Sequence, residues 1–232
     1  MAFALLVRHG RTAANSGGVL AGRTAGVVLD ELGQKQADDT AHRIAELPVA
    51  AIVSSPLERC AQTAEAIRAA AKTPVEVVTD ERLTECGYGE WTGQQLKTLA
   101  RTPMWKVVQA HPSGATFPGG ESMREMQARA VDAVRDWDER VTKAHGAQAI
   151  WVAVSHGDVI KAVLADALGM HLDNFQRIVV DPASVSVISY TPLRPFVVRF
   201  NEHGDLGTLA PRGRPRRRKR ADSDAAVGGG AG

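Results

Sequence analysis

One stretch near the start of the chain decides the fold and carries chemistry at its end: Ala4-Leu5-Leu6-Val7-Arg8-His9-Gly10-Arg11-Thr12. Four consecutive apolar residues before a charged turn predict a short strand that is buried on both faces. Directly after it, Arg8 offers a planar fork of donors that fits a phosphate, and His9 offers a nitrogen lone pair near neutral pH. Gly10 permits a tight turn behind them. Because ligands of open α/β sheets bind beyond the carboxyl ends of strands, we expect a site here.

Strands and helices alternate along the rest of the chain. Short apolar runs predict further strands at residues 50–53, 75–78, 150–154, 185–190 and 196–200. Apolar positions that recur every three or four residues predict helices at residues 32–47, 56–71, 123–141 and 159–168. This alternation predicts an α/β fold, a three-layer α/β/α sandwich with a mostly parallel central sheet.

Capping residues predict where two of these helices begin. Ser122 and Glu125 have the spacing of a capping box before the helix at 123–141. Ser55 and Pro56 suit the cap and the first turn of the helix at 56–71. Arg59 then lies in the first turn of that helix, where the helix amino terminus also favours an anion.

Residues 17–24 differ by one residue from a phosphate-binding P-loop, because Arg23 stands where the motif requires lysine. A P-loop also needs a strand directly before it and a helix directly after it. Here residues 8–12 precede the segment and do not predict a strand. Residues 25–28 follow it and do not predict a helix. We therefore interpret residues 12–30 as a loop over the strand ends rather than a nucleotide site.

Five polar side chains each follow a predicted strand: Arg8, His9, Arg59, Glu85 and His156. An α/β sheet brings such positions to one edge. Two arginines there supply bidentate donors and positive charge for a dianionic phosphoryl group, without a lysine or a metal. A neutral imidazole can attack phosphorus and form a covalent phosphohistidine, while a carboxylic acid protonates the leaving alkoxide. Glu85 is the candidate acid, and a bound phosphate dianion would raise its pKa.

In combination, these motifs resemble the histidine phosphatase superfamily, in its phosphoglycerate mutase-like branch. The resemblance covers about residues 3–190 and rests on motifs in the family's order: Arg8-His9-Gly10, Ser54-Ser55-Pro56-Leu57-Glu58-Arg59 with Gln62-Thr63-Ala64, Leu83-Thr84-Glu85 with Tyr88-Gly89, and Ser155-His156-Gly157. It implies that His9 is the nucleophile and Glu85 the proton donor. The phosphate pocket that it implies consists of Arg8, Asn15, Arg59, His156 and Gly157. Gly22, Arg23 and Tyr88 are expected to line the substrate site.

Departures from the family pattern bear on the substrate. The mutases that this chain resembles have arginine at the position of Cys86 and lysine at that of Leu96, and those basic groups hold the substrate carboxylate. Their absence favours a phosphatase that hydrolyses small phosphomonoesters, with a phosphomutase as the alternative. Ala21 replaces a small hydroxyl residue of the family, and Arg11 replaces an acidic residue of the mutases. No cofactor is implied, and the expected partner is a small phosphorylated metabolite.

Length and composition predict one catalytic domain. The 232 residues suffice for one sizeable core, and no linker divides residues 1–203. Residues 92–120 contain several prolines and are expected to form an insertion over the site. Two cysteines are too few for a disulfide scaffold, no signal peptide is recognisable, and no stretch has the roughly 18 apolar residues of a membrane span. We therefore expect a cytoplasmic protein without a membrane span.

The end of the chain differs in charge from the rest. Residues 211–232 hold seven of the 28 basic and two of the 26 acidic residues, so this part carries +5 and the remainder −3. We expect residues 204–232 to be a disordered basic tail, because its Arg- and Gly-rich composition cannot build a core. Such a tail can attract nucleic acid or anionic lipid, which gives a second class of function, a nucleic-acid-binding protein with an idle pocket. The sequence leaves the oligomeric state open, a dimer included.

Overall fold

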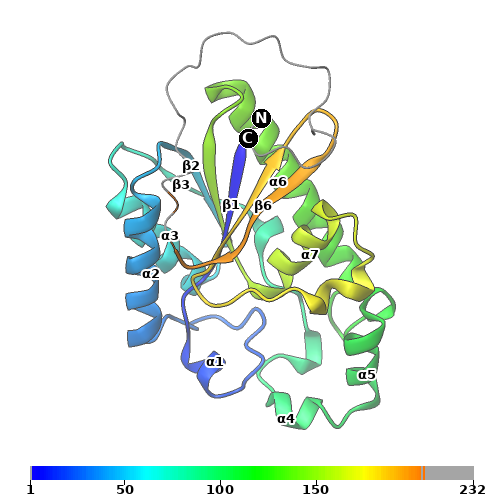
Figure 1. Ribbon diagram of the computed structural model, residues 1–232. Helices are drawn as coiled ribbons and strands as arrows, with labels where there is room; N and C mark the ends of the chain where they lie inside the picture. Colours follow the sequence, from blue (N-terminus) through cyan, green and yellow to red (C-terminus); the bar gives the residue numbers. More distant parts are fainter. Residues whose placement is uncertain (1, 205, 207–232) are drawn as a thin grey trace.

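A six-stranded sheet forms the centre of the computed structural model, which describes residues 2–204 and residue 206 (Figure 1). Its strands are β1 (Phe3–Arg8), β2 (Val49–Ser54), β3 (Val77–Thr79), β4 (Ile150–Ser155), β5 (Val185–Tyr190) and β6 (Pro195–Glu202). Their spatial order is β3-β2-β4-β1-β5-β6. The first four strands run parallel to one another, and β5 pairs antiparallel with both β1 and β6. The predicted mostly parallel sheet is therefore confirmed.

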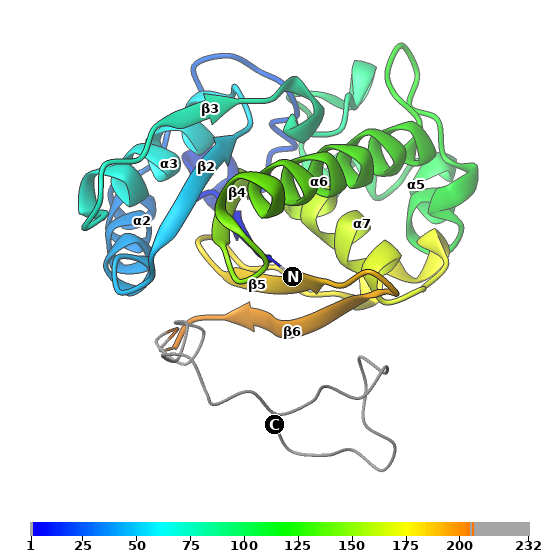
Figure 2. The ribbon, with the colours of Figure 1, turned by 90° about the horizontal axis from the view of Figure 1, so that it is seen from above.

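Helices cover both faces of this sheet. The structure contains α1 (Ala13–Ser16), α2 (Glu31–Ile44), α3 (Glu58–Ala70), α4 (Leu96–Leu99), α5 (Pro103–Ala110), α6 (Met123–His145) and α7 (Gly157–Ala167). Short 3-10 turns are η1 (Glu81–Leu83), η2 (Gly89–Trp91), η3 (Pro112–Gly114) and η4 (Leu172–Arg177). Figure 2 shows α2 and α3 on one side of the sheet and α6 and α7 on the other. This is the predicted three-layer α/β/α arrangement.

The alternation of side chains along β1 explains why helices must pack on both faces of the sheet. Leu5 and Val7 pack with the apolar residues of α2 and α3, whereas Ala4 and Leu6 belong to the larger cluster that contains α6 and α7. All four side chains are buried. A strand whose successive residues point to opposite faces can bury every one of them only between two helical layers.

Strand register places two histidines side by side. β1 pairs with β4 so that Arg8 lies opposite Ser155, and each strand is followed at once by a histidine, His9 or His156. On the other side of β4, Ser54 at the end of β2 pairs with Val154. The carboxyl ends of three neighbouring parallel strands therefore meet at one edge, as the sequence predicts.

The start of α3 differs from the prediction. The helix begins at Glu58, and its cap residue Leu57 makes no side-chain capping bond. Ser55 is therefore not the helix cap, and Pro56 lies before the helix rather than in its first turn. The hydroxyl of Ser55 instead makes a hydrogen bond to His156 at 2.8 Å and accepts the N–H of Leu57, the residue before the helix, at 3.4 Å.

The loop at residues 12–30 contains one helical turn that periodicity did not predict. Thr12 and Asn15 form a capping box around the four residues of α1, a local interaction too short to produce an apolar stripe. After residues 17–24 the next helix is α2, at Glu31. No helix directly follows the P-loop-like segment, and the nucleotide interpretation rejected from the sequence has no support in the fold.

Residues 92–120 form α4, α5 and η3. In Figure 1 α1, α4 and α5 lie beyond the carboxyl ends of the parallel strands. Backbone hydrogen bonds join this segment to the loop at residues 17–22, with Gly93 N 2.7 Å from the oxygen of Leu20 and Leu96 N 2.8 Å from that of Gly18. Apart from residues 204 and 206, the predicted tail lies outside the described residues. Among those described, no helix has the length and apolar character to cross a membrane.

We expect Ser122→Ala to lower the free energy of unfolding by about 1 kcal/mol, because it removes the cap of α6. The hydroxyl of Ser122 accepts the N–H of Glu125 at 3.1 Å, and the Glu125 carboxylate accepts the N–H of Ser122 at 2.8 Å. Urea denaturation measures the loss. Ser122→Asp, which retains a side-chain acceptor, serves as the control. An alanine variant as stable as the parent protein would contradict a stabilising role for this cap.

Candidate active site

His9 is a buried, neutral imidazole whose lone pair lies on a defined nitrogen. Its Nδ1 lies 2.7 Å from the carbonyl oxygen of Gly10, which can only accept, so Nδ1 carries the hydrogen and Nε2 carries the lone pair. The Nε of Arg59 donates to that Nε2 at 3.3 Å. Burial, followed by the charges of Arg59 and Arg8, lowers the pKa of His9 to about 3. The imidazole is therefore unprotonated and able to act as a nucleophile near neutral pH.

His156 lies against His9 with the opposite tautomer. The ring centroids are 5.3 Å apart in an edge-on arrangement. Nη2 of Arg59 lies 3.2 Å from Nδ1 of His156 and can only donate, so Nδ1 accepts and the hydrogen is on Nε2. That Nε2 donates to the hydroxyl of Ser55 at 2.8 Å. Burial and the neighbouring charges lower the pKa of His156 well below its usual value.

Two arginines supply buried donors at the same place. Arg8 donates from Nη1 to the carbonyl of Val180 at 2.7 Å, and Arg59 donates from Nη2 to the carbonyl of Gly22 at 2.8 Å. Nε of Arg8 and Nη1 of Arg59 are buried and have no acceptor among the described residues. Charged N–H groups left without an acceptor are costly inside a protein, and oxygens of an anion satisfy them. The pair therefore fits a phosphate.

The pKa of Glu85 is shifted upward, whereas the pKa values of the two histidines are shifted downward. Burial and then the charge of Asp158 raise its pKa to about 7, against the smaller opposing effects of the two arginines. One carboxyl oxygen accepts the N–H of Cys86 at 2.9 Å, and the other lies 4.0 Å from Nδ1 of His156. A carboxyl group with a pKa near neutrality can both give and take a proton at working pH.

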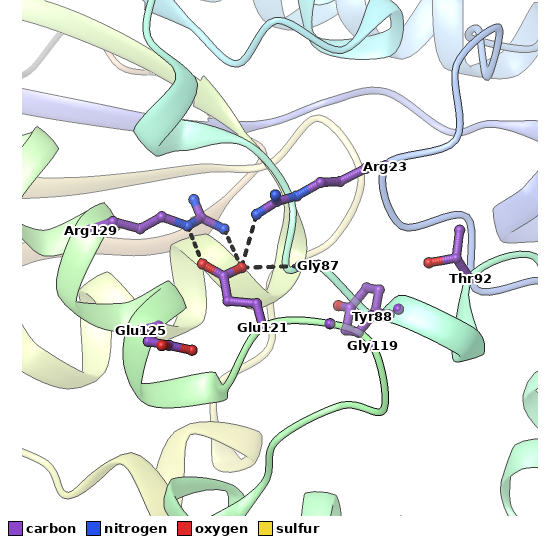
Figure 3. A pocket seen from close by; sticks show the side chains of 10 residues that line it. Arg23, Gly87, Tyr88, Thr92, Gly119, Glu121, Glu125 and Arg129 are labelled. Carbon is purple, nitrogen blue, oxygen red and sulfur yellow. Dashed lines mark hydrogen bonds and ion pairs between the residues drawn. The ribbon is translucent and has the colours of Figure 1, made fainter.

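Three side chains from two distant segments hold the backbone on both sides of Glu85. Arg23 and Arg129 donate to the carbonyl oxygen of Glu85 at 2.7 and 3.2 Å. Glu121 accepts the N–H of Gly87 at 3.0 Å and forms ion pairs with both arginines (Figure 3). The loop that carries the carboxyl group is thereby fixed although it has no regular secondary structure.

Tyr88 and Gly157 also lie at this edge. The hydroxyl of Tyr88 donates to Asp158 at 2.8 Å, and its ring packs edge-on against Phe117. A Cβ on Gly157 would lie 3.5 Å from the guanidinium carbon of Arg8, so the glycine lets the arginine lie close to the start of α7. These contacts place both residues at the predicted site.

Gly22 contacts the site, whereas Asn15 does not contact it directly. Gly22 has a φ of +52°, which favours glycine, and a Cβ there would meet Thr92 at 2.8 Å. The amide oxygen of Asn15 accepts from Thr12 in the capping box of α1. Within the described part of the chain, no hydrogen bond joins Asn15 to a histidine or an arginine of the site.

Sequence reasoning missed four residues that shape this site: Ser55, Glu121, Arg129 and Asp158. The periodicity and capping patterns explain each of them locally, as a helix cap, a helix surface or a loop residue. Their contacts join residues 34 or more positions apart, and no short motif indicates such pairs. Only the position of Asp158, two residues after a site histidine, offered a signal.

The described residues contain no group of three or more His, Cys, Asp or Glu side chains arranged to hold a metal ion. What the fold and the site together define is a class: an α/β protein with an anion site at the carboxyl ends of parallel strands, containing a neutral histidine and a protonatable carboxyl group.

Comparison with known proteins identifies the family within that class. Residues 4–203 match the model of the histidine phosphatase superfamily, branch 1, and the chain belongs to this family. Phosphoserine phosphatase 1 of Hydrogenobacter thermophilus is 32% identical over 208 residues, which cover 88% of this chain and 93% of the relative. A 2,3-bisphosphoglycerate-dependent phosphoglycerate mutase of Thermoplasma acidophilum is 28% identical over 190 residues, 81% and 87% of the two chains.

A solved structure shares the whole fold. The structure of a mycobacterial glucosyl-3-phosphoglycerate phosphatase complexed with VO3 aligns with a TM-score of 0.75 and 25% identity, over 86% of this chain and 98% of that chain. The predicted family resemblance, the predicted fold and the predicted enzyme class, a phosphatase, are confirmed by these matches.

We expect Glu85→Gln to stabilise the protein relative to the parent as pH rises. In the unfolded chain Glu85 ionises near its usual pKa of 4.5, but in the folded protein only near 7. Ionisation therefore favours the unfolded state between these values, and glutamine removes the effect. The gain should be about 1–3 kcal/mol larger at pH 8 than at pH 4.5, measured by urea denaturation.

Glu65→Gln provides a control of opposite sign. The hydrogen bond from Arg68 lowers the pKa of the Glu65 carboxyl group, so its ionisation favours the folded state. This exposed substitution should give a small loss of stability that is larger at pH 8. A Glu85→Gln variant whose stability gain did not change with pH would mean that Glu85 is not held in its neutral form by the fold.

Proposed function

We propose that this protein is a phosphatase that hydrolyses small phosphomonoesters through a covalent phosphohistidine on His9, with Glu85 as general acid and base. The observation that carries the proposal is the neutral Nε2 of His9 beside two buried guanidinium N–H groups that lack an acceptor. The names of the relatives support a small phosphorylated substrate, since they include phosphoserine and glucosyl-3-phosphoglycerate phosphatases.

In the first step, His156 takes up a proton at Nδ1, which the negative charge of an incoming phosphate favours. The substrate phosphate binds to Arg8, Arg59 and this protonated His156, with Asn15 and the start of α7 at Gly157 as further donors. Its oxygens replace Nε2 of His9 as the acceptor for Arg59, which frees the lone pair for attack. Nε2 forms a bond to phosphorus while the bond from phosphorus to the alcohol oxygen breaks. Glu85 transfers its proton to that departing oxygen. The hydrogen bond that Nδ1–H donates to the carbonyl of Gly10 stabilises the positive charge on the phosphorylated imidazole of His9.

In the second step, the ionised Glu85 accepts a proton from water while the water oxygen bonds to phosphorus. The phosphorus–nitrogen bond breaks, inorganic phosphate leaves, and His9 and Glu85 return to their starting states. One carboxyl group can serve both steps because its pKa lies close to neutral pH. The fixed charges of the arginines stabilise the peripheral oxygens in both transition states.

A phosphomutase is the second candidate, and a relative with that name supports it. It would share the first step but pass the phosphoryl group to a second hydroxyl. Cys86 and Leu96 stand where the mutases have basic residues that hold the substrate carboxylate. This difference favours hydrolysis. We further propose that residues 92–120 shape the alcohol side of the site, since α4 and α5 lie at its end of the sheet (Figure 1).

A cytoplasmic location, a dimer and contacts of the basic tail with anionic partners stay predictions from the sequence. The tail-driven nucleic-acid-binding function would depend on residues outside the described part of the chain. Nucleic-acid binding by the tail would make no use of the buried site described above. We therefore rank nucleic-acid binding below catalysis.

We expect His9→Ala to lower kcat by at least about 1,000-fold, because it removes the attacking atom. Trapping of the intermediate gives a direct readout: the parent protein, incubated with a ³²P-labelled phosphomonoester and quenched in alkaline detergent, should form an acid-labile, base-stable phosphoprotein, and the variant should not. The exposed His145→Ala is the matched control and should retain both signals.

Retention of activity by His9→Ala would overturn the phosphohistidine mechanism. The same labelled protein separates the two candidate functions. A phosphatase releases its label as inorganic phosphate, whereas transfer of label between 3-phosphoglycerate and 2-phosphoglycerate would establish a mutase.

We expect Asp158→Asn to move the alkaline limb of the kcat/KM profile to lower pH. That limb reports the loss of the Glu85 proton, and the charge of Asp158 contributes to the raised pKa of Glu85. Asparagine retains an acceptor for Tyr88. Asp166→Asn, on the same helix but paired with Arg135, should leave the limb in place. An unchanged limb in Asp158→Asn would show that burial alone keeps Glu85 protonated.

A further inference from the structure

An open cavity of about 700 Å³ has walls that include Arg23, Tyr88, Thr92 and Glu121 (Figure 3), and two of its arginines, Arg23 and Arg129, donate to the carbonyl oxygen of Glu85. Gly22, whose carbonyl accepts from Arg59, lies next to this wall, because a Cβ on Gly22 would lie 2.8 Å from the hydroxyl of Thr92 and 3.2 Å from the ring of Tyr88. The volume is within the range of about 300–1,000 Å³ that small-molecule sites occupy. The cavity is therefore placed to receive the alcohol half of an ester whose phosphate is bound at Arg59.

The two cations of the cavity wall are already neutralised. The carboxylate of Glu121 lies between Arg23 and Arg129, 2.9 Å from Nη2 of Arg23 and 2.6 Å from Nε of Arg129 (Figure 3). Burial alone would raise the pKa of Glu121, but the bonds from Arg129 and the Gly87 N–H outweigh it and lower the pKa. Glu121 is thus ionised at neutral pH, and with Glu125 on the same wall the side-chain charges sum to zero.

A carboxylate on the substrate has no unpaired cation to bind in this cavity. If it displaced Glu121 from Arg23 and Arg129, it would leave that carboxylate without its partners, and if it bound the exposed part of Arg23 instead, it would lie beside the ionised Glu121. Both consequences cost free energy. A cavity with compensated charges therefore discriminates against an anionic alcohol half.

Hydroxyl groups suit the same wall. A hydroxyl both donates and accepts, and the wall presents guanidinium N–H donors beside carboxylate acceptors. The side chain of Arg23 is 46% exposed and lines the cavity. The backbones of Gly87 and Gly120, which also line the cavity, pack closely, because a Cβ on Gly120 would lie 2.2 Å from the carbonyl oxygen of Gly87. No larger side chain fits there to fill the space.

We propose that the cavity bounded by Arg23, Glu121 and Arg129 selects phosphomonoesters of uncharged, hydroxyl-bearing alcohols, such as polyol or sugar phosphates, over phosphomonoesters whose alcohol half carries a carboxylate. This inference rests on the proposed phosphatase activity and gives that activity its substrate class.

Two matched pairs of substrates test the inference, since the members of each pair differ only by CH2OH against COO⁻. They are glycerol 3-phosphate against 3-phosphoglycerate, and sorbitol 6-phosphate against 6-phosphogluconate. We expect kcat/KM, measured by phosphate release, to favour the neutral member of each pair by at least about tenfold. Comparable values, or a preference for the carboxylates, would overturn the selection while leaving the phosphatase function intact.

Glu121→Gln shows whether Glu121 causes the preference. Loss of its charge frees the two arginines, so the ratio of neutral to anionic kcat/KM should fall by about tenfold within each pair. A ratio cancels any general loss of activity from the loop that carries Glu85. The exposed Glu65→Gln, which also removes one carboxylate, is the control and should retain the parent ratio.

A folded Glu121→Gln variant with the parent ratio would overturn the role of Glu121. Should that variant fail to fold, the parent protein's own ratios still decide the proposal. Absence of hydrolysis of all four esters and of 4-nitrophenyl phosphate would overturn the phosphatase function itself, and the selection with it.

Discussion

The buried guanidinium of Arg59 is the interaction on which the site depends. It contacts Nε2 of His9, Nδ1 of His156 and the carbonyl of Gly22, three groups from separate segments. Because the guanidinium only donates, it fixes which nitrogen of each ring has the lone pair. Its charge, together with burial, keeps both rings neutral. A bound phosphate would meet the positive charge that this geometry concentrates.

The same burial has opposite effects on the acid and on the base. Burial disfavours the charged form of any group, so it lowers the pKa of His9 and raises that of Glu85. His9 is thus unprotonated and Glu85 protonated in the same pH range, which are the states that the proposed mechanism requires. This separation has a cost, because the fold holds a carboxyl group where its ionised form is unfavourable.

Order in the loop around Glu85 comes from ion pairs rather than from secondary structure. Arg23 precedes α2, Glu121 precedes α6, and Arg129 lies on α6, yet all three hold the same few backbone atoms. The contacts that position the acid also compensate the charges of the adjoining cavity. The proposed proton transfer and the proposed substrate preference therefore depend on one set of side chains.

The sequence by itself determined the strand–helix alternation, the mostly parallel sheet and five residues at its carboxyl edge, His9 and Arg59 among them. These follow from apolar periodicity and from the rule that such edges bind ligands, both of which are local patterns. Only the tertiary structure decided three properties of the site. They are the tautomers of the histidines, the hydrogen bond of Ser55 to His156 in place of helix capping, and the pairing of Glu121 with two arginines. Burial and contacts between distant residues set these properties, and neither quantity exists until the chain is folded.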